Sequence, residues 1–152
     1  MILVSACLLG INCKYNGENN KDEKVIEYLK DKQYIIACPE QLGGLSTPRT
    51  PSEIIEFDGH EVIKGNAKVK SNEGIDVTSN FIKGAQECLK IANLYDCKEA
   101  ILKEGSPSCG SNYIYDGTFC GNKIHGVGVT TALFKNHGIK VTSEKEIYQN
   151  IK

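Results

Sequence analysis

The sequence lacks three features: a charge excess of one sign, a long apolar run, and a closely spaced cysteine pair. Its 18 Lys and Arg residues nearly balance 19 Asp and Glu residues, which gives a net charge of −1. General nucleic-acid binders normally carry a basic patch, so no large nucleic acid is expected as a partner. No segment approaches the roughly 20 apolar residues that cross a bilayer, and the N-terminus has no signal-type pattern. These absences predict a cytoplasmic protein with no membrane partner.

The sequence contains seven cysteines but no C-x-x-C motif. An odd number of cysteines in a reducing compartment disfavours a full disulfide framework. Metal binding or thiol chemistry is the usual alternative, and it depends on where the cysteines fall along the chain.

The apolar pattern predicts strands that alternate with helices. A length of 152 residues suits one domain, here residues 1–152, and no internal repeat or linker is visible. Alternation of this kind indicates a three-layer, Rossmann-like α/β domain with a mainly parallel sheet. Strands are predicted at 2–6, 34–37, 100–103 and 139–142; helices at 22–32, from 78 or 79 to about 92, at 127–135 and from 143 onward; and a small hairpin insertion at 53–70.

Three cysteines follow predicted strands. Cys7, Cys38 and Cys109 come after the first, second and third strands, and parallel strands end at one common edge. Ligands of open α/β sheets bind at that edge, so these three thiols are expected to converge there. Cys13 could reach the same place. Of the remaining cysteines, Cys88 and Cys97 are expected to be buried structural residues, and the role of Cys120 is undecided.

Three thiolates could bind zinc, copper(I) or an iron–sulfur cluster. Three protein ligands leave one metal position open for a substrate, whereas four would close the site. Two alternatives therefore stay open beside an iron–sulfur enzyme. One is a zinc-dependent hydrolase or deaminase-like enzyme, and the other is a metal or redox sensor with Cys13 as fourth ligand.

Several polar groups accompany these cysteines. Glu40 lies two residues after Cys38 and could move protons beside a metal, although a helix cap is an equal alternative. Ser106 and Ser108 flank a proline directly before Cys109. The three histidines show no metal-ligand spacing.

Two segments could bind an anion. Arg49 is the sole arginine and lies between Pro48 and Pro51, so it could grip a phosphate or a base, or be an ordinary loop charge. Gly126, Gly128 and Thr130 open a predicted helix whose free amides could receive an anion, although this signal is weak.

Taken together, these motifs resemble the thiouracil desulfurase family, which was long catalogued as a domain of unknown function. The resemblance runs in order over nearly the whole chain. It rests on Ser5-Ala-Cys-Leu-Leu-Gly10, Lys14-Tyr-Asn-Gly17, Cys38-Pro-Glu40, Gly43-Gly-Leu-Ser-Thr-Pro-Arg49, Asp76-Val-Thr78, Ser106-Pro-Ser-Cys-Gly110, Tyr115-Asp-Gly-Thr-Phe119 and Gly126-Val-Gly-Val-Thr130.

The resemblance implies a [4Fe–4S] cluster held by Cys7, Cys38 and Cys109, with the fourth iron free and Cys13 not a ligand. It implies a non-redox exchange of thiocarbonyl sulfur for oxygen on a thiolated uracil, taken as base, nucleoside or monophosphate. Glu40 is then the expected acid/base group. Ser106 and Ser108 are expected to hydrogen-bond the substrate or the departing sulfur, and Arg49 with the 126–130 turn to hold a nucleotide phosphate.

Overall fold

A four-stranded parallel sheet forms the centre of the protein. The computed structural model describes residues 1–147 and orders the strands β2 (Tyr34–Ala37), β1 (Ile2–Ser5), β5 (Glu99–Leu102) and β8 (Lys140–Ser143). All three strand pairs are parallel, with Leu3 opposite both Ile35 and Ala100. Strands β1 and β5 are almost continuously apolar because both of their faces are covered by helices.

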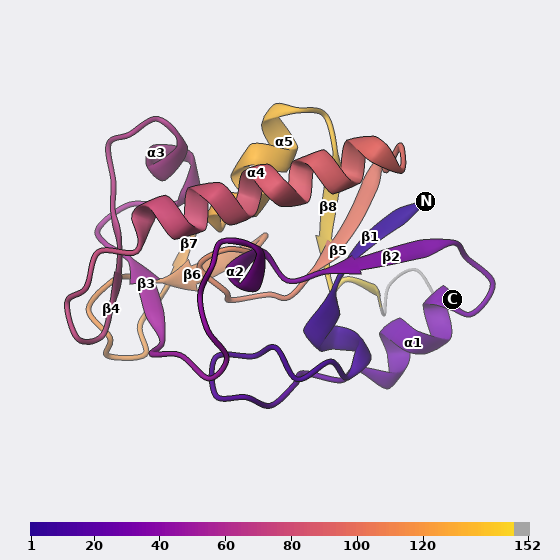
Figure 1. The fold of residues 1–152 in the computed structure, drawn as a ribbon, viewed down its shortest axis with the longest axis horizontal. Helices are drawn as coiled ribbons and strands as arrows, with labels where there is room; N and C mark the ends of the chain where they lie inside the picture. The colour runs from indigo at the N-terminus through magenta and orange to yellow at the C-terminus, as the bar shows by residue number, and fades with distance from the viewer. Residues whose placement is uncertain (148–152) are drawn as a thin grey trace.

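Helices cover both faces of this sheet, as predicted. Leu3 and Leu102 pack toward α4 (Thr78–Leu94) and α5 (Val129–Asn136). The alternating residues Val4 and Ile101 pack on the other face with Val25 and Leu29 of α1 (Glu23–Leu29). Figure 1 shows α4 and α5 on one side of the strands and α1 on the other. The three-layer α/β prediction is therefore confirmed.

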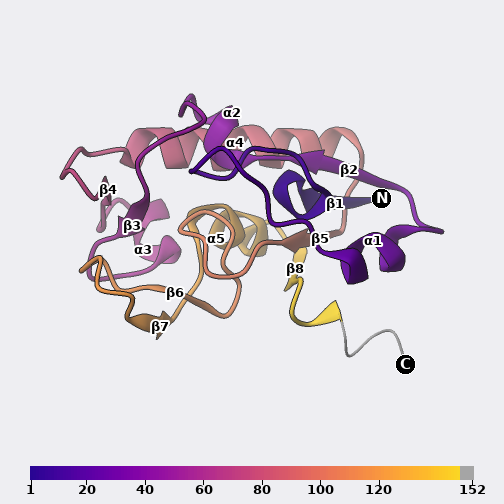
Figure 2. The same ribbon diagram turned by 90° about the horizontal axis from the view of Figure 1, so that it is seen from below.

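Two small antiparallel hairpins extend the domain. The predicted hairpin insertion is present as β3 (Ser52–Ile54) and β4 (Val69–Ser71), with the short helix α3 (Gly59–Ile63) between them. The second hairpin, β6 (Tyr113–Tyr115) and β7 (Lys123–His125), was not predicted. Figures 1 and 2 place both hairpins together at the end of the molecule opposite α1.

Two short helices follow strands at the carboxyl edge of the sheet. The 3-10 helix η1 (Ala6–Leu9) comes directly after β1, and α2 (Pro39–Leu42) follows β2 with Cys38 as its N-cap residue. Helix α2 lies unusually close to α4. A Cβ on Gly84 would stand 2.0 Å from the carbonyl oxygen of Pro39, and one on Gly43 would stand 2.1 Å from that of Asn80. Only glycine permits this contact, which fixes α2 beside the sheet edge.

The remaining predictions differ in detail. Val77, rather than Thr78 or Ser79, is the N-cap residue of α4, and the Oδ1 of the preceding Asp76 accepts a hydrogen bond from the Thr78 backbone N–H. Residues 144–146 form a turn, and the rest of the final predicted helix lies outside the described residues. Within residues 1–147, no helix has the length and apolar character needed to cross a bilayer.

Candidate active site

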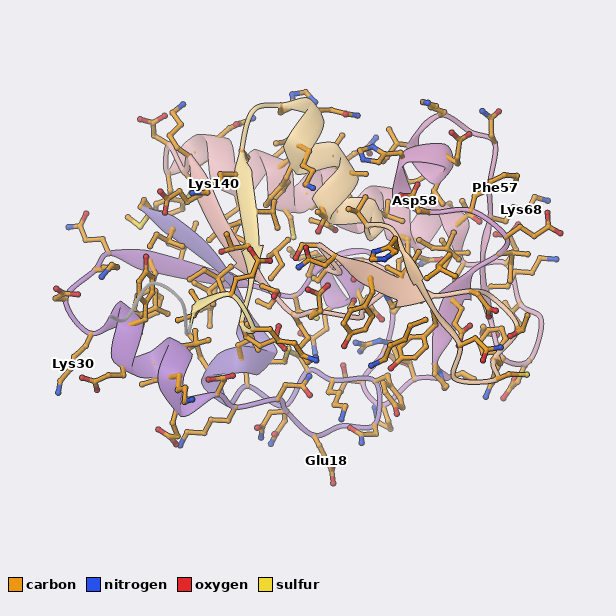
Figure 3. All side chains as sticks on the ribbon, turned by 180° about the vertical axis from the view of Figure 1, so that it is seen from behind. Glu18, Lys30, Phe57, Asp58, Lys68 and Lys140 are labelled. Carbon is orange, nitrogen blue, oxygen red and sulfur yellow. The ribbon has the colours of Figure 1, made fainter. Side chains whose placement is uncertain are left out.

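A cavity of about 540 Å³ opens at the carboxyl ends of the parallel strands. Cys7 reaches it from η1, Cys38 from the start of α2, and Cys109 from the loop after β5. Cys13 also lines it, from the long loop whose Glu18 points into solvent in Figure 3. The predicted convergence of the three thiols is therefore present, and a fourth accompanies them.

The Cys13 thiol lies within hydrogen-bonding reach of the sulfurs of Cys38 and Cys7. These two contacts, together with burial, raise the pKa of Cys13 far above its usual range. The contact with Cys13 lowers the pKa of Cys7, against the opposing effect of burial. The contact with Cys13 likewise lowers the pKa of Cys38, to about 6. The pKa values of Cys7 and Cys38 are thus lowered and that of Cys13 is raised, and the Cys38 Sγ lies 3.8 Å from the Cys13 carbonyl oxygen.

Cys109 has a different environment. It is 4% exposed, and burial raises its pKa to about 12. Ser5 partly opposes this effect, since its hydroxyl donates a hydrogen bond to the Cys109 sulfur at 3.5 Å. The Lys103 backbone N–H donates to the same hydroxyl at 3.0 Å and so fixes its direction. Such a buried thiol ionises readily only when a metal binds it.

The donor set suits a cluster of several metal ions. Thiolates are the preferred ligands of iron–sulfur clusters. Within residues 1–147, no three His, Cys, Asp or Glu side chains are grouped as ligands of a single ion. Thiolates that bind separate corners of a cluster need not converge so closely. Two cations offset the charge: Lys103 lowers the pKa of Cys7, and Arg49 that of Cys38.

Glu40 is connected to both predicted serines. Its Oε2 accepts a hydrogen bond from Ser108 Oγ at 3.1 Å, and Ser106 Oγ lies 3.1 Å from Ser108 Oγ. A hydroxyl has a single proton, so when Ser108 donates to Glu40 it must accept from Ser106. All three residues line the cavity, which gives a continuous hydrogen-bonded chain leading to a half-buried carboxylate.

Arg49 lines the cavity, but its guanidinium is already engaged by other residues. Its Nε forms an ion pair with Glu40 Oε1 at 3.0 Å, and its side chain is 8% exposed. Its other nitrogens donate to the carbonyl oxygens of Ser46 and Cys13 and to Thr47 Oγ1. Four of the five N–H groups are thus used, and a two-point phosphate contact is not available. Arg49 instead fixes the carboxylate of Glu40.

The 126–130 turn is not available to an anion either. The backbone N–H of Gly128 donates to Gly110, and that of Thr130 donates to Ser108. A Cβ on Gly128 would stand 2.4 Å from the Ser108 carbonyl carbon. Neither Gly126, Gly128 nor Thr130 lines the cavity. The turn therefore supports the loop that carries Cys109, and its amides are not free for the predicted anion.

Glu104 holds the same loop from inside. Its carboxylate accepts backbone hydrogen bonds from Ser111 and Asn112 at 2.9 Å and a side-chain bond from Asn112 at 2.7 Å. Burial alone would raise the pKa of Glu104, but these bonds, led by those of Asn112, lower it to about 2. The loop bearing Ser106, Ser108 and Cys109 is thus fastened by a buried, ionised carboxylate.

The remaining cysteines do not line the cavity. Cys88 and Cys97 are buried in the core beside α4, as predicted, and burial raises the pKa of each. Cys120 is exposed in the turn of the β6–β7 hairpin.

Sequence reasoning missed several residues of the cavity. Ser5, Lys103 and Glu104 lie at or just after the ends of β1 and β5, so the edge argument that selected the cysteines also applies to them. The aromatic residues Tyr113, Tyr115 and Phe119 line the cavity from the second hairpin. The alternation Tyr-Ile-Tyr followed by Asp-Gly is a hairpin signal that could have found them.

Comparisons with known proteins agree with this arrangement. The 2-thiouracil desulfurase family matches residues 2–146. The uncharacterized protein YbbK of Bacillus subtilis strain 168 is 50% identical over 147 residues, which is 97% of each chain. A solved structure of a [4Fe-4S]-dependent thiouracil desulfidase, TudS, has a TM-score of 0.84 and 40% identity, covering 97% of this chain and 93% of that one.

Proposed function

This chain belongs to the 2-thiouracil desulfurase family, and from that premise we propose that it is a [4Fe–4S]-dependent desulfidase of thiolated uracil. It is an enzyme that acts on a thiolated pyrimidine. The observation that carries the proposal is the meeting of Cys7, Cys38 and Cys109 with Glu40 in one cavity. In the proposed reaction the thiocarbonyl compound and water give the carbonyl compound and hydrogen sulfide, with no change of oxidation state.

Cys7, Cys38 and Cys109 are the residues proposed to hold the cluster, and three protein ligands would leave one iron open. Held by these residues, a cluster would supply a soft Lewis acid that polarises a thiocarbonyl bond. Cys13 is proposed to remain a thiol that donates to neighbouring sulfurs, in keeping with its raised pKa.

Glu40 is the proposed proton carrier. Each of its oxygens accepts one hydrogen bond, from Arg49 or from Ser108, and each keeps a second lone pair. The carboxylate can therefore take a proton from the attacking water at the ring carbon. Ser108 and Ser106 can then pass a proton toward the departing sulfur or a ring nitrogen, because they form one hydrogen-bonded chain with Glu40.

The substrate is proposed to be a free thiouracil or its nucleoside or monophosphate. If a phosphate is present, Lys14 suits it better than Arg49. Lys14 is half-buried, lines the cavity, and has no carboxylate partner within ion-pair distance among residues 1–147.

Anaerobic reconstitution followed by an activity screen tests the proposal. The protein should be brown, contain iron and acid-labile sulfide in equal amounts, and release sulfide from 2-thiouracil, 4-thiouracil or the corresponding thiouridine monophosphates. A colourless protein with one bound zinc would support the hydrolase alternative. An iron-loaded protein that desulfurates none of these compounds would contradict the proposed function.

A further inference from the structure

The β6–β7 hairpin forms an aromatic wall of the cavity. Tyr113 and Tyr115 are two residues apart on β6, so their side chains project from the same face of the strand. Their rings pack edge to face, with the ring centroids 6.4 Å apart. Phe119 follows in the turn, and all three rings line the same cavity as the cysteine thiols. Phe119 is only half-buried, unlike the fully buried Phe81 and Phe134 of the core. Its ring therefore has a free surface within the cavity.

The backbone of Phe119 has an unusual conformation. Three described residues other than glycine have a positive φ: Glu56 at 68°, Asp96 at 52° and Phe119 at 59°. Asp tolerates this region through local hydrogen bonds, whereas a bulky aromatic residue does not. Such conformations persist where the surroundings impose them, and they concentrate at functional sites.

Glu53 of β3 is what imposes this conformation. Its Oε1 accepts hydrogen bonds from the backbone N–H of Gly117 at 2.9 Å and of Phe119 at 3.2 Å. Gly117 also packs directly on β3, where an added Cβ would stand 2.6 Å from the Ile54 carbonyl oxygen. One carboxylate thus fixes the turn and the position of the Phe119 ring.

We infer that Phe119 is a specificity-determining residue that stacks on the pyrimidine ring, and that Glu53 is its positioning residue. This inference rests on the proposed function. A thiolated pyrimidine offers a flat π face whatever the position of its sulfur, and an aromatic ring at the cavity wall can bind that face. Stacking contributes to the bound substrate and to the transition state alike, so it acts on binding rather than on the chemical step.

Phe119→Ala and Glu53→Ala test the assignment in the iron-loaded enzyme. Phe119→Ala should raise the KM for thiouracil, and the dissociation constant of uracil measured by calorimetry, about 5- to 100-fold. The kcat should change less than about twofold. Glu53→Ala should also raise KM. The double variant should bind uracil no more weakly than Phe119→Ala alone, since both substitutions act through one ring. Phe119→Tyr should restore binding.

Matched controls separate stacking from loss of structure. Phe57→Ala removes a ring that is 48% exposed and lies at the outer edge of the molecule in Figure 3. Glu56→Gln alters an exposed carboxylate two residues after β3. Both should leave KM unchanged. Phe119→Gly should bind as poorly as Phe119→Ala without a lower Tm, because glycine accepts the positive φ.

The outcomes are distinguishable. Desulfuration by the wild type with unchanged KM and uracil affinity in Phe119→Ala would overturn the inference and leave the proposed function intact. A fall of kcat and Tm together in that variant would also overturn it, by showing a structural role. A wild type that neither binds uracil nor desulfurates any thiouracil would overturn the proposed function itself.

Discussion

Each carboxylate oxygen of Glu40 accepts one hydrogen bond, from Arg49 on one side and from Ser108 on the other. The arginine in turn donates to the Cys13 carbonyl oxygen, and the serine belongs to the loop that carries Cys109. Single side chains therefore connect two cysteine-bearing loops of the cavity to the proposed proton carrier. Conservative substitutions should separate these roles.

The first residue-scale prediction concerns the ligands. Ser in place of Cys7, Cys38 or Cys109 should abolish cluster binding, because an alkoxide is a harder and less readily formed ligand than a thiolate. Iron and sulfide content after anaerobic reconstitution measures this.

The other cysteines are the controls for that experiment. Cys88→Ser and Cys97→Ser should keep the full iron content, since both residues are buried in the core and neither lines the cavity. Cys13→Ser should keep the cluster as well. Loss of iron in Cys13→Ser would instead indicate a closed site with four ligands.

Glu40→Gln should retain the cluster and lose most turnover. The amide keeps the size of the side chain and can still accept from Ser108, but it cannot take a proton from water. General acid–base groups typically contribute about 10²–10⁴-fold, and kcat should fall within that range. Turnover within a few-fold of wild type at full iron content would assign the proton transfer to another group.

Arg49→Lys should lower kcat on the order of tenfold while KM changes little. Lysine preserves the charge, but its single ammonium cannot reproduce the planar set of contacts to Glu40, Ser46 and Cys13. Steady-state kinetics with thiouracil and with thiouridine monophosphate measure both constants. Lys83→Gln, an exposed change on α4, is the control. A KM effect confined to the monophosphate would restore the phosphate role for Arg49.

At the scale of elements, the position of α2 depends on its contact with α4. Cys38 caps α2 and Glu40 lies in its first turn, so a displacement of this short helix moves a proposed ligand and the carboxylate together. The glycines Gly43 and Gly84 permit the close approach of the two helices.

Gly84→Ala should therefore destabilise the protein even though it improves helix propensity. Alanine gains about 1 kcal/mol of propensity in a helix interior. Its methyl group would stand 2.0 Å from the Pro39 carbonyl oxygen, a backbone atom that no side-chain rotation can move. Overpacking typically costs about 1–3 kcal/mol, and a contact this short belongs at the upper end. Urea unfolding should show a net decrease in the free energy of unfolding, and the reconstituted variant should contain less iron. Gln86→Ala, exposed on the same helix, should be nearly neutral.

At the scale of the whole molecule, Glu104 couples folding to pH. Its pKa is about 2 in the folded protein, against a usual value near 4.5, because the loop amides stabilise the charged form. A depressed pKa gives stability that is fully present above about pH 4.5 and is lost as the pH falls toward 2. The shift corresponds to about 3 kcal/mol at 1.36 kcal/mol per pKa unit.

Glu104→Gln should lower the free energy of unfolding at pH 7 and flatten its dependence on pH between about 5 and 2. Urea midpoints measured across this range test the expectation. Glu87→Gln, an ion-paired carboxylate on the surface of α4, should leave the slope unchanged. An equal slope in wild type and Glu104→Gln would mean that other carboxylates dominate acid unfolding.

The sequence by itself determined the layers of the fold and the positions of the three cysteines. Apolar runs such as 2–5 and 100–102 encode buried parallel strands, and strand order along the chain then places Cys7, Cys38 and Cys109 at one edge. These inferences hold because they depend on periodicity and on connection, which are properties of the chain itself. The family resemblance, with the desulfurase activity and the iron–sulfur chemistry it implies, was also readable from ordered motifs.

Only the tertiary structure decided how the polar groups are partnered. Arg49 is expected to be a free cation from its loop, but the ion pair with Glu40 and the Cys13 carbonyl oxygen use its donors. The amides of the 126–130 turn are expected to be free at a helix start, but the cysteine-bearing loop occupies them. A hydrogen-bond donor has a partner only when another segment folds against it. Contacts between residues far apart in the sequence leave no periodicity or local spacing from which they could be predicted.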